Sequence, residues 1–260
     1  MKKHMRLYAI KTEIVKTGDN IAAVVLEALK GQGLQLEDGD ILALTSKIIA
    51  CAGGHIAKLS DVKPSEKAKQ LAERFSLQPE FAELILHEAD RVYGGVEKAV
   101  LTLKNGVLTA NAGVDNKNAP FGFAVLWPRD VQGWVKRVRE DILGKTGRSV
   151  GVLIVESGLV PLRMGTRGLA LAVAGFKPVI DCRGERDIFG KSMVMTRRAV
   201  ADDLASAAHL LMGEAAEKTP VVLIRDAPVV FDDGVYGSDD MMMPFNECIF
   251  MSVFLAGSQK

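Results

Sequence analysis

The sequence predicts an α+β fold that combines a mixed β-sheet with helices. Helix and strand patterns alternate along the 260 residues without a regular strand–helix–strand period, and an Asn-Gly turn at 105–106 joins two β-prone runs. With 48% apolar and 25% charged residues, the chain has the composition of a globular protein with a large core. We therefore expect residues 1–260 to form one unit, with a boundary between sub-lobes near residues 120–150.

The first third of the chain is predicted to contain three helices and a strand. Capping residues and apolar spacing place the helices at 20–30, 65–75 and 79–92, and a short buried strand at 41–44. Asp19 or Asn20 caps the first helix, and Gly31 ends it. Pro64 and Ser65 open the second helix, and Pro79 opens the third.

The remainder of the chain is predicted to hold a hairpin, two helices and three more strands. The runs Val100–Leu103 and Val107–Ala110 flank Asn105-Gly106, which is the strongest short-range hairpin signal. Helices are expected at 130–143 and 196–212, and buried strands at 150–155, 168–174 and 221–224, the last of these being the final buried strand.

Charge and hydropathy exclude several classes of partner. Lys and Arg total 33 and Asp and Glu total 32, so the net charge of +1 produces no long-range field for nucleic acid or an anionic membrane. The apolar stretch 168–176 is nine residues long, whereas about 20 are needed to span a bilayer. The three cysteines form no CxxC pair and the chain begins with no secretory signal, so we expect a reducing, cytoplasmic location.

The segment from Met241 to Leu255 is richer in methionine and phenylalanine than a solvated terminus should be. Pro244, Asn246 and Glu247 interrupt it, which argues against a membrane span. We expect it to be buried, either in the core or across a dimer interface.

Three acidic residues lie where predicted strands or helices end, and each has two interpretations. Asp115 lies among the asparagines of 111–118, Glu156 precedes Ser157 after the strand at 150–155, and Glu214 follows the helix at 196–212. Oxygen side chains of this kind suit a hard divalent cation. The alternatives are an Asx-turn at Asp115, a solvated loop at Glu156, and fraying at Gly213 that moves Glu214 into solvent.

Two further loops invite a phosphate-binding interpretation. Arg163 and Arg167 lie among glycines, and an arginine fork matches phosphate or carboxylate, although both side chains are equally compatible with solvent exposure. The segment 181–192 resembles a Walker A loop, but five residues separate Gly184 from Gly190 where that loop has four. The spacing therefore argues against a P-loop.

Taken together, these segments resemble the family of GTP-dependent F420-0:L-glutamate ligases, from about Ile14 to Arg225. The most specific part is Arg183-Gly184-x-x-Asp187-x-x-Gly190, followed by Val200-Ala201-Asp202-Asp203 and, further on, Leu211-Met212-Gly213-Glu214. Asn111-Ala112-Gly113-Val114-Asp115, Thr45-Ser46-Lys47 and Glu37-Asp38-Gly39-Asp40 also match. Several matches in the same order are more specific than any one of them.

The resemblance implies a fold of two interleaved lobes without a P-loop, a homodimer, and GTP as co-substrate. It implies Mg²⁺ or Mn²⁺, with K⁺ as an additional ion. By position, the metal ligands would be Asp115, Glu156, Ser157 and Glu214, and the nucleotide contacts would include Ser46, Lys47, Asn118, Met212 and Gly213. The family activity is amide formation driven by nucleotide hydrolysis: a phosphoryl group moves to an acceptor carboxylate, and the amine of L-glutamate attacks the acyl phosphate. Lys47 and Arg163 are the expected stabilisers of the transferring phosphate.

Some residues depart from the family pattern. Glu156 replaces an aspartate, Leu159-Val160 replaces Gly-Arg before Pro161, and Cys51 stands where a lysine contacts the nucleotide. Three functions therefore remain open: glutamate ligation to the deazaflavin precursor of F420, ligation to another acceptor such as a folate-like or other small carboxylate, and nucleotide and metal binding without catalysis.

Overall fold

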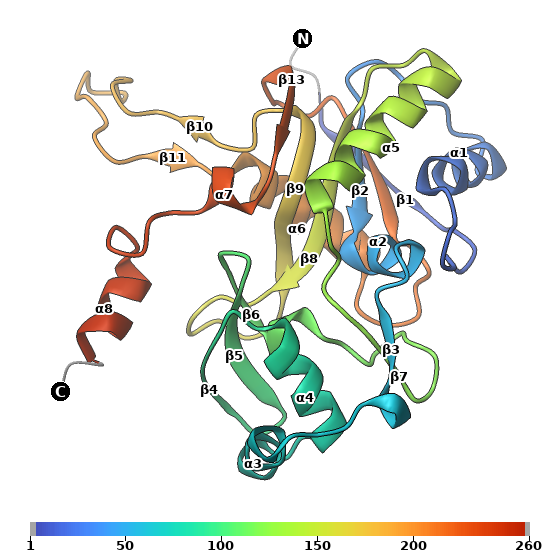
Figure 1. The fold of residues 1–260 in the computed structure, drawn as a ribbon. Coiled ribbons are helices and arrows are strands. Elements are labelled where there is room, and N and C mark those ends of the chain that lie inside the picture. The colour runs from blue at the N-terminus through green and yellow to red at the C-terminus, as the bar shows by residue number, and fades with distance from the viewer. Residues whose placement is uncertain (1–3, 258–260) are drawn as a thin grey trace.

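A six-stranded mixed sheet forms the centre of the computed structural model, which describes residues 4–257 (Figure 1). Its strands, in spatial order, are β1 (Arg6–Ile10), β12 (Val221–Arg225), β2 (Ile41–Thr45), β8 (Gly151–Gly158), β9 (Arg167–Phe176) and β13 (Phe231–Tyr236). Within this sheet only β2 and β8 run parallel to each other, and every other neighbouring pair is antiparallel. The mixed sheet confirms the α+β class.

Helices cover both faces of this sheet, as Figure 1 shows. The helices α1 (Ile21–Gly31), α2 (Ser46–Ala52) and α5 (Val131–Thr146) pack on one face, and α6 (Val200–Met212) packs on the other. Strand β2 contributes Leu42 and Leu44 to the first core and Ile41 and Ala43 to the second. A strand buried on both faces needs a continuous apolar run, which is why 41–44 could be predicted.

Residues 56–125 form an inserted lobe beside the sheet. Its elements are β3 (Ile56–Lys58), η1 (Leu59–Asp61), α3 (Glu66–Phe75), α4 (Pro79–Glu88), β4 (Arg91–Val96), β5 (Ala99–Lys104), β6 (Val107–Ala110), η2 (Asn111–Gly113) and β7 (Phe123–Val125). Strands β3 and β7 pair with each other where the chain enters and leaves the lobe. A separate apolar cluster around Ile85 and Val114 gives the lobe its own core.

The capping residues of three helices and the turn residues of one hairpin are those that the sequence predicted. Asn20 accepts a hydrogen bond from the amide of Ala23 and starts α1, and Ser65 accepts one from Ala68 and starts α3. Asp130 caps α5, which ends at Gly147 in a left-handed conformation. Asn105 and Gly106 both have positive φ, as the predicted two-residue hairpin turn between β5 and β6 requires.

Two predicted helix boundaries are wrong, and the main sheet has an edge strand that the sequence did not indicate. The helix expected to reach residue 92 ends at Glu88, because Ala89 is extended and Arg91–Val96 pairs with β5 as β4. The helix expected from residue 196 begins at Val200, since Arg197–Arg198 forms β11. The strand at 221–225 is the final buried strand, as predicted, but β13, which has no fully buried residue and contains Asp232 and Asp233, follows it and pairs with the edge of β9.

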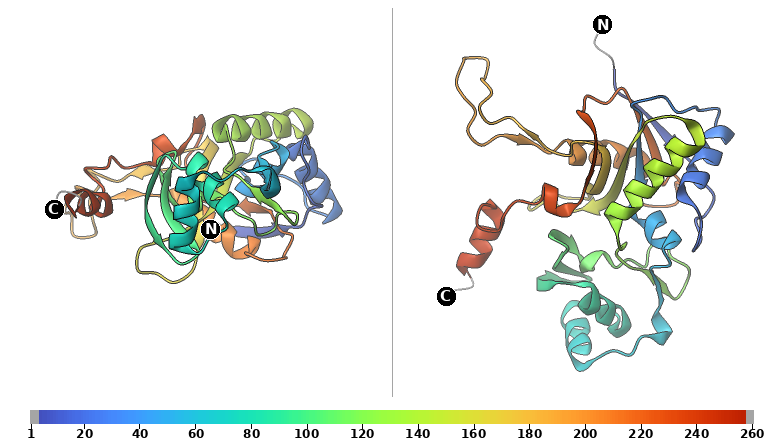
Figure 2. Two further views of the ribbon diagram at one scale, coloured as in Figure 1. Left: turned by 60° about the horizontal axis from the view of Figure 1, so that its bottom comes forward. Right: turned by 45° about the horizontal axis from the view of Figure 1, so that its top comes forward.

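An extended arm, residues 180–198, projects from the sheet between β10 (Ile180–Asp181) and β11 (Figure 2). Asp187 Oδ1 accepts hydrogen bonds from the amides of Phe189 and Lys191, both at 2.9 Å, and so shapes the tip. The Gly184–Lys191 segment therefore lies in a hairpin arm and not between a strand and a helix, as a P-loop would. Ile188 and Phe189 are 93% and 80% exposed at this tip.

The C-terminal segment contains α7 (Ser238–Met241), which contacts β9 and β13, and α8 (Ile249–Gly257), which stands away from the sheet on the same side as the arm (Figures 1 and 2). The expectation of burial in the core is wrong for Ile249, Phe250 and Val253, which are exposed, whereas Met251 is buried. Burial across an interface stays a prediction. Within residues 4–257, no helix has both the length and the apolar character needed to cross a membrane.

A buried ion pair fixes the start of β2. Asp40 is 1% exposed, and its two carboxylate oxygens accept hydrogen bonds from Nε and Nη2 of Arg225 at 2.8 and 2.7 Å. Asp40 Oδ2 also accepts from the Glu37 amide, and the Asp40 carbonyl accepts from Gly151 on β8. The Glu37–Asp40 motif thus joins β12, β2 and β8 and has a structural role.

We expect Asp40→Ala to lower the free energy of unfolding by about 3–5 kcal/mol, because it leaves the Arg225 guanidinium without its bidentate partner in a buried site. Urea denaturation followed by circular dichroism measures the change. As a control, Lys69→Ala breaks the exposed pair with Glu66 and should cost less than about 1 kcal/mol. Equal losses in the two variants would contradict the role given to Asp40.

Candidate active site

The carboxyl ends of the parallel strands β2 and β8 place the first two polar residues of the site side by side. Thr45 is the register partner of Val155, so the next residues, Ser46 and Glu156, meet at the same edge of the sheet. The buried Ser46 hydroxyl donates a hydrogen bond to Glu156 Oε2. The amide of Ser157 donates to Glu156 Oε1 at 3.0 Å. Glu156 was expected after the strand, but β8 continues to Gly158 and holds it within the sheet.

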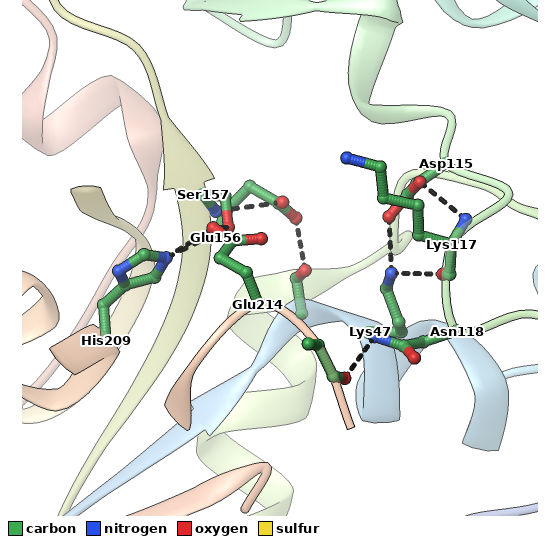
Figure 3. Close-up of polar contacts among 10 residues, drawn as sticks. Lys47, Asp115, Lys117, Asn118, Glu156, Ser157, His209 and Glu214 are labelled. Atoms are coloured by element: carbon green, nitrogen blue, oxygen red, sulfur yellow. Dashed lines mark hydrogen bonds and ion pairs between the residues drawn. The ribbon is translucent and has the colours of Figure 1, made fainter. Parts of the chain in front are cut away.

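Glu214 joins this edge from the end of α6. Its Oε1 accepts a hydrogen bond from Ser157 Oγ at 2.8 Å and lies 2.8 Å from His209 Nε2 (Figure 3). The same oxygen accepts a hydrogen bond from Thr166 Oγ1 at 2.7 Å. Burial acts to raise the pKa of Glu214, but the hydrogen bonds from Thr166, Ser157 and His209 outweigh it and hold this pKa below its ordinary value. Glu214 is therefore held in place as a carboxylate by these three partners, although its side chain is 51% exposed.

Asp115 faces this cluster from the exit of the inserted lobe. Its backbone exchanges two hydrogen bonds with Val125, and its Oδ2 pairs with Lys47 Nζ at 2.5 Å. Lys47 Nζ also donates to the carbonyl of Lys117 at 2.7 Å, and the Lys117 amide donates to Asp115 Oδ1 at 2.8 Å. The Asx-type turn expected at Asp115 is formed, and the divalent cation expected there stays a prediction.

Asn118 connects the two halves of the site. Its Nδ2 donates to the carbonyl of Ala215 at 2.9 Å, which ties the loop after Asp115 to the segment that carries Glu214 (Figure 3). The structure therefore gathers seven of the predicted residues, which are Ser46, Lys47, Asp115, Asn118, Glu156, Ser157 and Glu214. His209 and Thr166 belong to the same network. Sequence reasoning missed both, and only the placement of His209 five residues before Glu214 could have suggested it.

The electrostatics of Glu156 fit a divalent cation. Burial raises the pKa of Glu156, hydrogen bonds from Ser46 and Ser157 and the charge of Lys47 act in the opposite sense, and the charge of Asp115 adds to the rise. A buried carboxylate with another acid in range and a donor set made of oxygen atoms is the environment that Mg²⁺ or Mn²⁺ stabilises. Among the described residues, no three acidic, histidine or cysteine side chains already converge as metal ligands, and Lys47 is the cation that contacts Asp115.

Three of the predicted site residues, which are Arg163, Met212 and Gly213, do not take part through their side chains in the hydrogen-bond network described above. Arg163 is exposed in the loop between β8 and β9, and among described residues its guanidinium has no hydrogen-bond partner. The Met212 side chain is buried against the sheet and its carbonyl accepts a hydrogen bond from Thr219 Oγ1, and the nucleotide contact expected here stays a prediction. Gly213 ends α6 with φ of +71°, where a Cβ would lie 2.3 Å from Glu217 Cδ.

Comparison with known proteins identifies a set of relatives. The sequence profile of the F420-0:gamma-glutamyl ligase family matches residues 9–226. A protein of Methanothermobacter thermautotrophicus named coenzyme F420:L-glutamate ligase is 40% identical over 216 residues, which are 83% of this chain and 86% of that protein. Proteins of the same name from Methanocaldococcus jannaschii and Archaeoglobus fulgidus are 34% and 33% identical, over 96% and 87% of this chain and 98% and 90% of their own lengths.

We expect Glu156→Gln to stabilise the metal-free protein and to abolish its stabilisation by Mn²⁺. The folded protein raises the pKa of the Glu156 carboxyl, so the free energy of unfolding of the wild type falls as pH rises from the ordinary glutamate pKa through the raised pKa. Glutamine does not ionise, so the variant lacks this fall. Melting temperatures between pH 5 and pH 8, with and without Mn²⁺, measure both effects.

The control for this experiment is Glu140→Gln on α5, whose carboxylate is exposed and pairs with Lys136. It should leave both the pH profile and the Mn²⁺ effect unchanged. If Glu156→Gln were stabilised by Mn²⁺ as much as the wild type is, Glu156 would not be a ligand.

Proposed function

Since the chain belongs to the F420-0:gamma-glutamyl ligase family and is a ligase, we propose that it forms an amide between L-glutamate and the carboxylate of the F420 precursor, with GTP as the co-substrate. The observation that carries this proposal is the meeting of Ser46, Glu156, Ser157 and Glu214 at the end of the parallel strands, opposite the Lys47–Asp115 pair. Such an edge is where α/β sheets bind ligands.

The proposed reaction has two steps. An oxygen of the acceptor carboxylate attacks the γ-phosphorus of GTP, the bond to the bridging oxygen breaks, and GDP leaves. The amine of L-glutamate then attacks the acyl carbon, phosphate leaves, and the amine loses a proton. Because phosphoryl transfer needs positioning and charge neutralisation more than covalent help, the site requires no serine or cysteine nucleophile.

The side chains have separate tasks in this reaction. Lys47, which pairs with Asp115, is within reach to donate to phosphate oxygens when the nucleotide binds. Ser46 and the Ser157 amide fix the orientation of Glu156, while His209 and Thr166 fix that of Glu214. Asn118 holds the loop after Asp115 against Ala215 and so keeps the nucleotide side of the site closed. Arg163 would be brought to the phosphate by its exposed loop.

Mg²⁺ or Mn²⁺ would be held by Asp115, Glu156, Ser157 and Glu214, with K⁺ as an additional ion. When bound, the divalent ion neutralises negative charge on the phosphates and on the three carboxylates. The oxygen donors and the buried charge of Glu156 support this assignment.

A second candidate acceptor is another small carboxylate, such as a folate-like molecule. Leu159, which stands in place of the family glycine before a lost arginine, is 53% exposed beside the site. Its apolar side chain alters the surface that the acceptor contacts, while the residues around Glu156 and Glu214 are those expected for the same chemistry. The two candidates share a mechanism and differ in the acceptor.

We expect the purified protein with GTP, Mg²⁺ and L-glutamate to extend the F420 precursor by at least one glutamate, detected by product mass. Arg163→Ala should lower the rate by roughly 10²–10³ if Arg163 is a positioned phosphate donor. Arg163→Lys should recover only part of it, because lysine lacks the bidentate fork. Arg6→Ala, which removes an exposed arginine on β1, serves as the control.

Each other outcome of this assay has a separate meaning. Phosphate release with a folate-like acceptor but not with the F420 precursor would select the second candidate. Tight binding of GTP and Mg²⁺ without amide formation on any acceptor would overturn the ligase proposal and leave a nucleotide- and metal-binding relative.

The proposed enzyme is a cytoplasmic homodimer, and the exposed apolar tip of the arm supports an interface there. We expect the double variant Ile188→Ser and Phe189→Ser to shift the protein from dimer to monomer in size-exclusion chromatography with light scattering. Val96→Ser, which removes another exposed apolar side chain in the inserted lobe, should not. A wild type that is monomeric at micromolar concentration would refute the dimer.

A further inference from the structure

A cavity of about 250 Å³ lies between the two lobes and the C-terminal segment. The inserted lobe contributes the β5–β6 hairpin with Leu108, the sheet contributes Leu159 and Leu169, and the C-terminal segment contributes Met241 and Met243. The lining is mostly apolar and rich in methionine. Neither the metal ligands nor the nucleotide contacts described above line this cavity.

The wall of the cavity begins next to the proposed reaction centre. Gly158 and Leu159, which follow Ser157 directly in the chain, both line it. Arg167 also lines it and is the register partner of Gly158 across the β8–β9 ladder. A molecule whose carboxylate lies at Glu156 and Ser157 can therefore extend past Gly158 into the cavity.

Two charged groups from the sheet side stand in the otherwise apolar wall. Arg167 offers a guanidinium, which suits an anionic or polar linking group. Asp202 at the start of α6 accepts a hydrogen bond from the Ala170 amide at 2.9 Å, close to the bulge between Ile154 and Val155. The charged lining residues thus belong to the sheet and α6, and Ser238 is a polar, uncharged residue in the wall formed by the C-terminal segment.

Methionines of the C-terminal segment line the wall opposite the sheet. Methionine is flexible and polarisable, and its sulfur makes favourable contacts with aromatic rings. Met242 packs on the hairpin turn so closely that a Cβ at Gly106 would lie 2.6 Å from its Sδ. A flat ring in the cavity would therefore contact the inserted lobe and the C-terminal segment together.

We infer that this cavity binds the uncharged aromatic ring system of the acceptor, while the acceptor carboxylate lies at the reaction centre. This inference rests on the proposed function, because that function places a carboxylate beside Ser157. An acceptor that joins a planar ring to a carboxylate through a polar chain matches the order of surfaces: methionines for the ring, Arg167 for the chain, and the edge of β8 for the carboxylate.

The direct test uses a 5-deazaflavin that lacks the carboxylate chain, titrated by fluorescence into the full chain without nucleotide or metal. We expect saturable binding to the wild type, about 3- to 10-fold weaker binding to Met243→Ala, and loss of binding in Leu159→Trp, which fills the cavity mouth. Met243 is 48% exposed, so its truncation should leave the melting temperature unchanged. Met5→Ala, a methionine before β1, is the matched control and should bind as the wild type does.

Turnover assays separate this inference from the proposed function. If the protein forms the amide, Met243→Ala should raise KM for the acceptor and leave kcat unchanged. Amide formation with an unchanged KM in Met243→Ala and Leu159→Trp would overturn the cavity assignment and leave the proposed function standing. If these variants weaken ring binding but no amide is formed, the cavity assignment stands and the proposed function is overturned. A change of oligomeric state in these variants, with ring binding unaltered, would assign the cavity to a second copy of the chain and overturn the inference.

Discussion

The parallel pairing of β2 with β8 is the constraint on which the rest of the structure depends. Parallel strands cannot be joined by a hairpin, so the chain between them must make a long crossover. Here that crossover contains α2, the inserted lobe and α5. The pairing sets Ser46 beside Glu156, and the return from the inserted lobe sets Asp115 beside Lys47. The β2–β8 register therefore determines one half of the candidate site, and the crossover that this pairing requires carries the other half.

Charged side chains lie at both ends of β2, but they are balanced differently at the two ends. At its start, Asp40 and Arg225 compensate each other inside the fold, so this pair is complete without a ligand. At its end, Glu156, Glu214 and Asp115 are oriented by hydroxyl, amide and imidazole groups, and Lys47 is the positive charge among them. With one lysine among three oriented acids, the site is suited to cations and to the phosphate groups that accompany them.

Local signals explain which features the sequence could predict. Caps at Asn20 and Ser65 and the Asn105-Gly106 turn depend on neighbouring residues, and each was located correctly. Strand β13 and the end of α4 depend on pairing with β9 and β5, which no local pattern contains. The site has the same limit: Ser46 and Glu156 are 110 residues apart, so residue chemistry alone left each acid with two interpretations. Resemblance to the family joined the acids, whereas His209 and the methionine-lined cavity emerged only from the fold.

The most direct measurement is a crystal structure with Mn²⁺ and a non-hydrolysable GTP analogue, in which anomalous scattering locates the metal. We expect a manganese peak about 2 Å from carboxylate oxygens of Asp115, Glu156 and Glu214, with Lys47 Nζ moved from Asp115 to a phosphate oxygen. A manganese peak away from the edge of β2 and β8, with the Lys47–Asp115 pair intact, would contradict the assignment of this edge as the catalytic site.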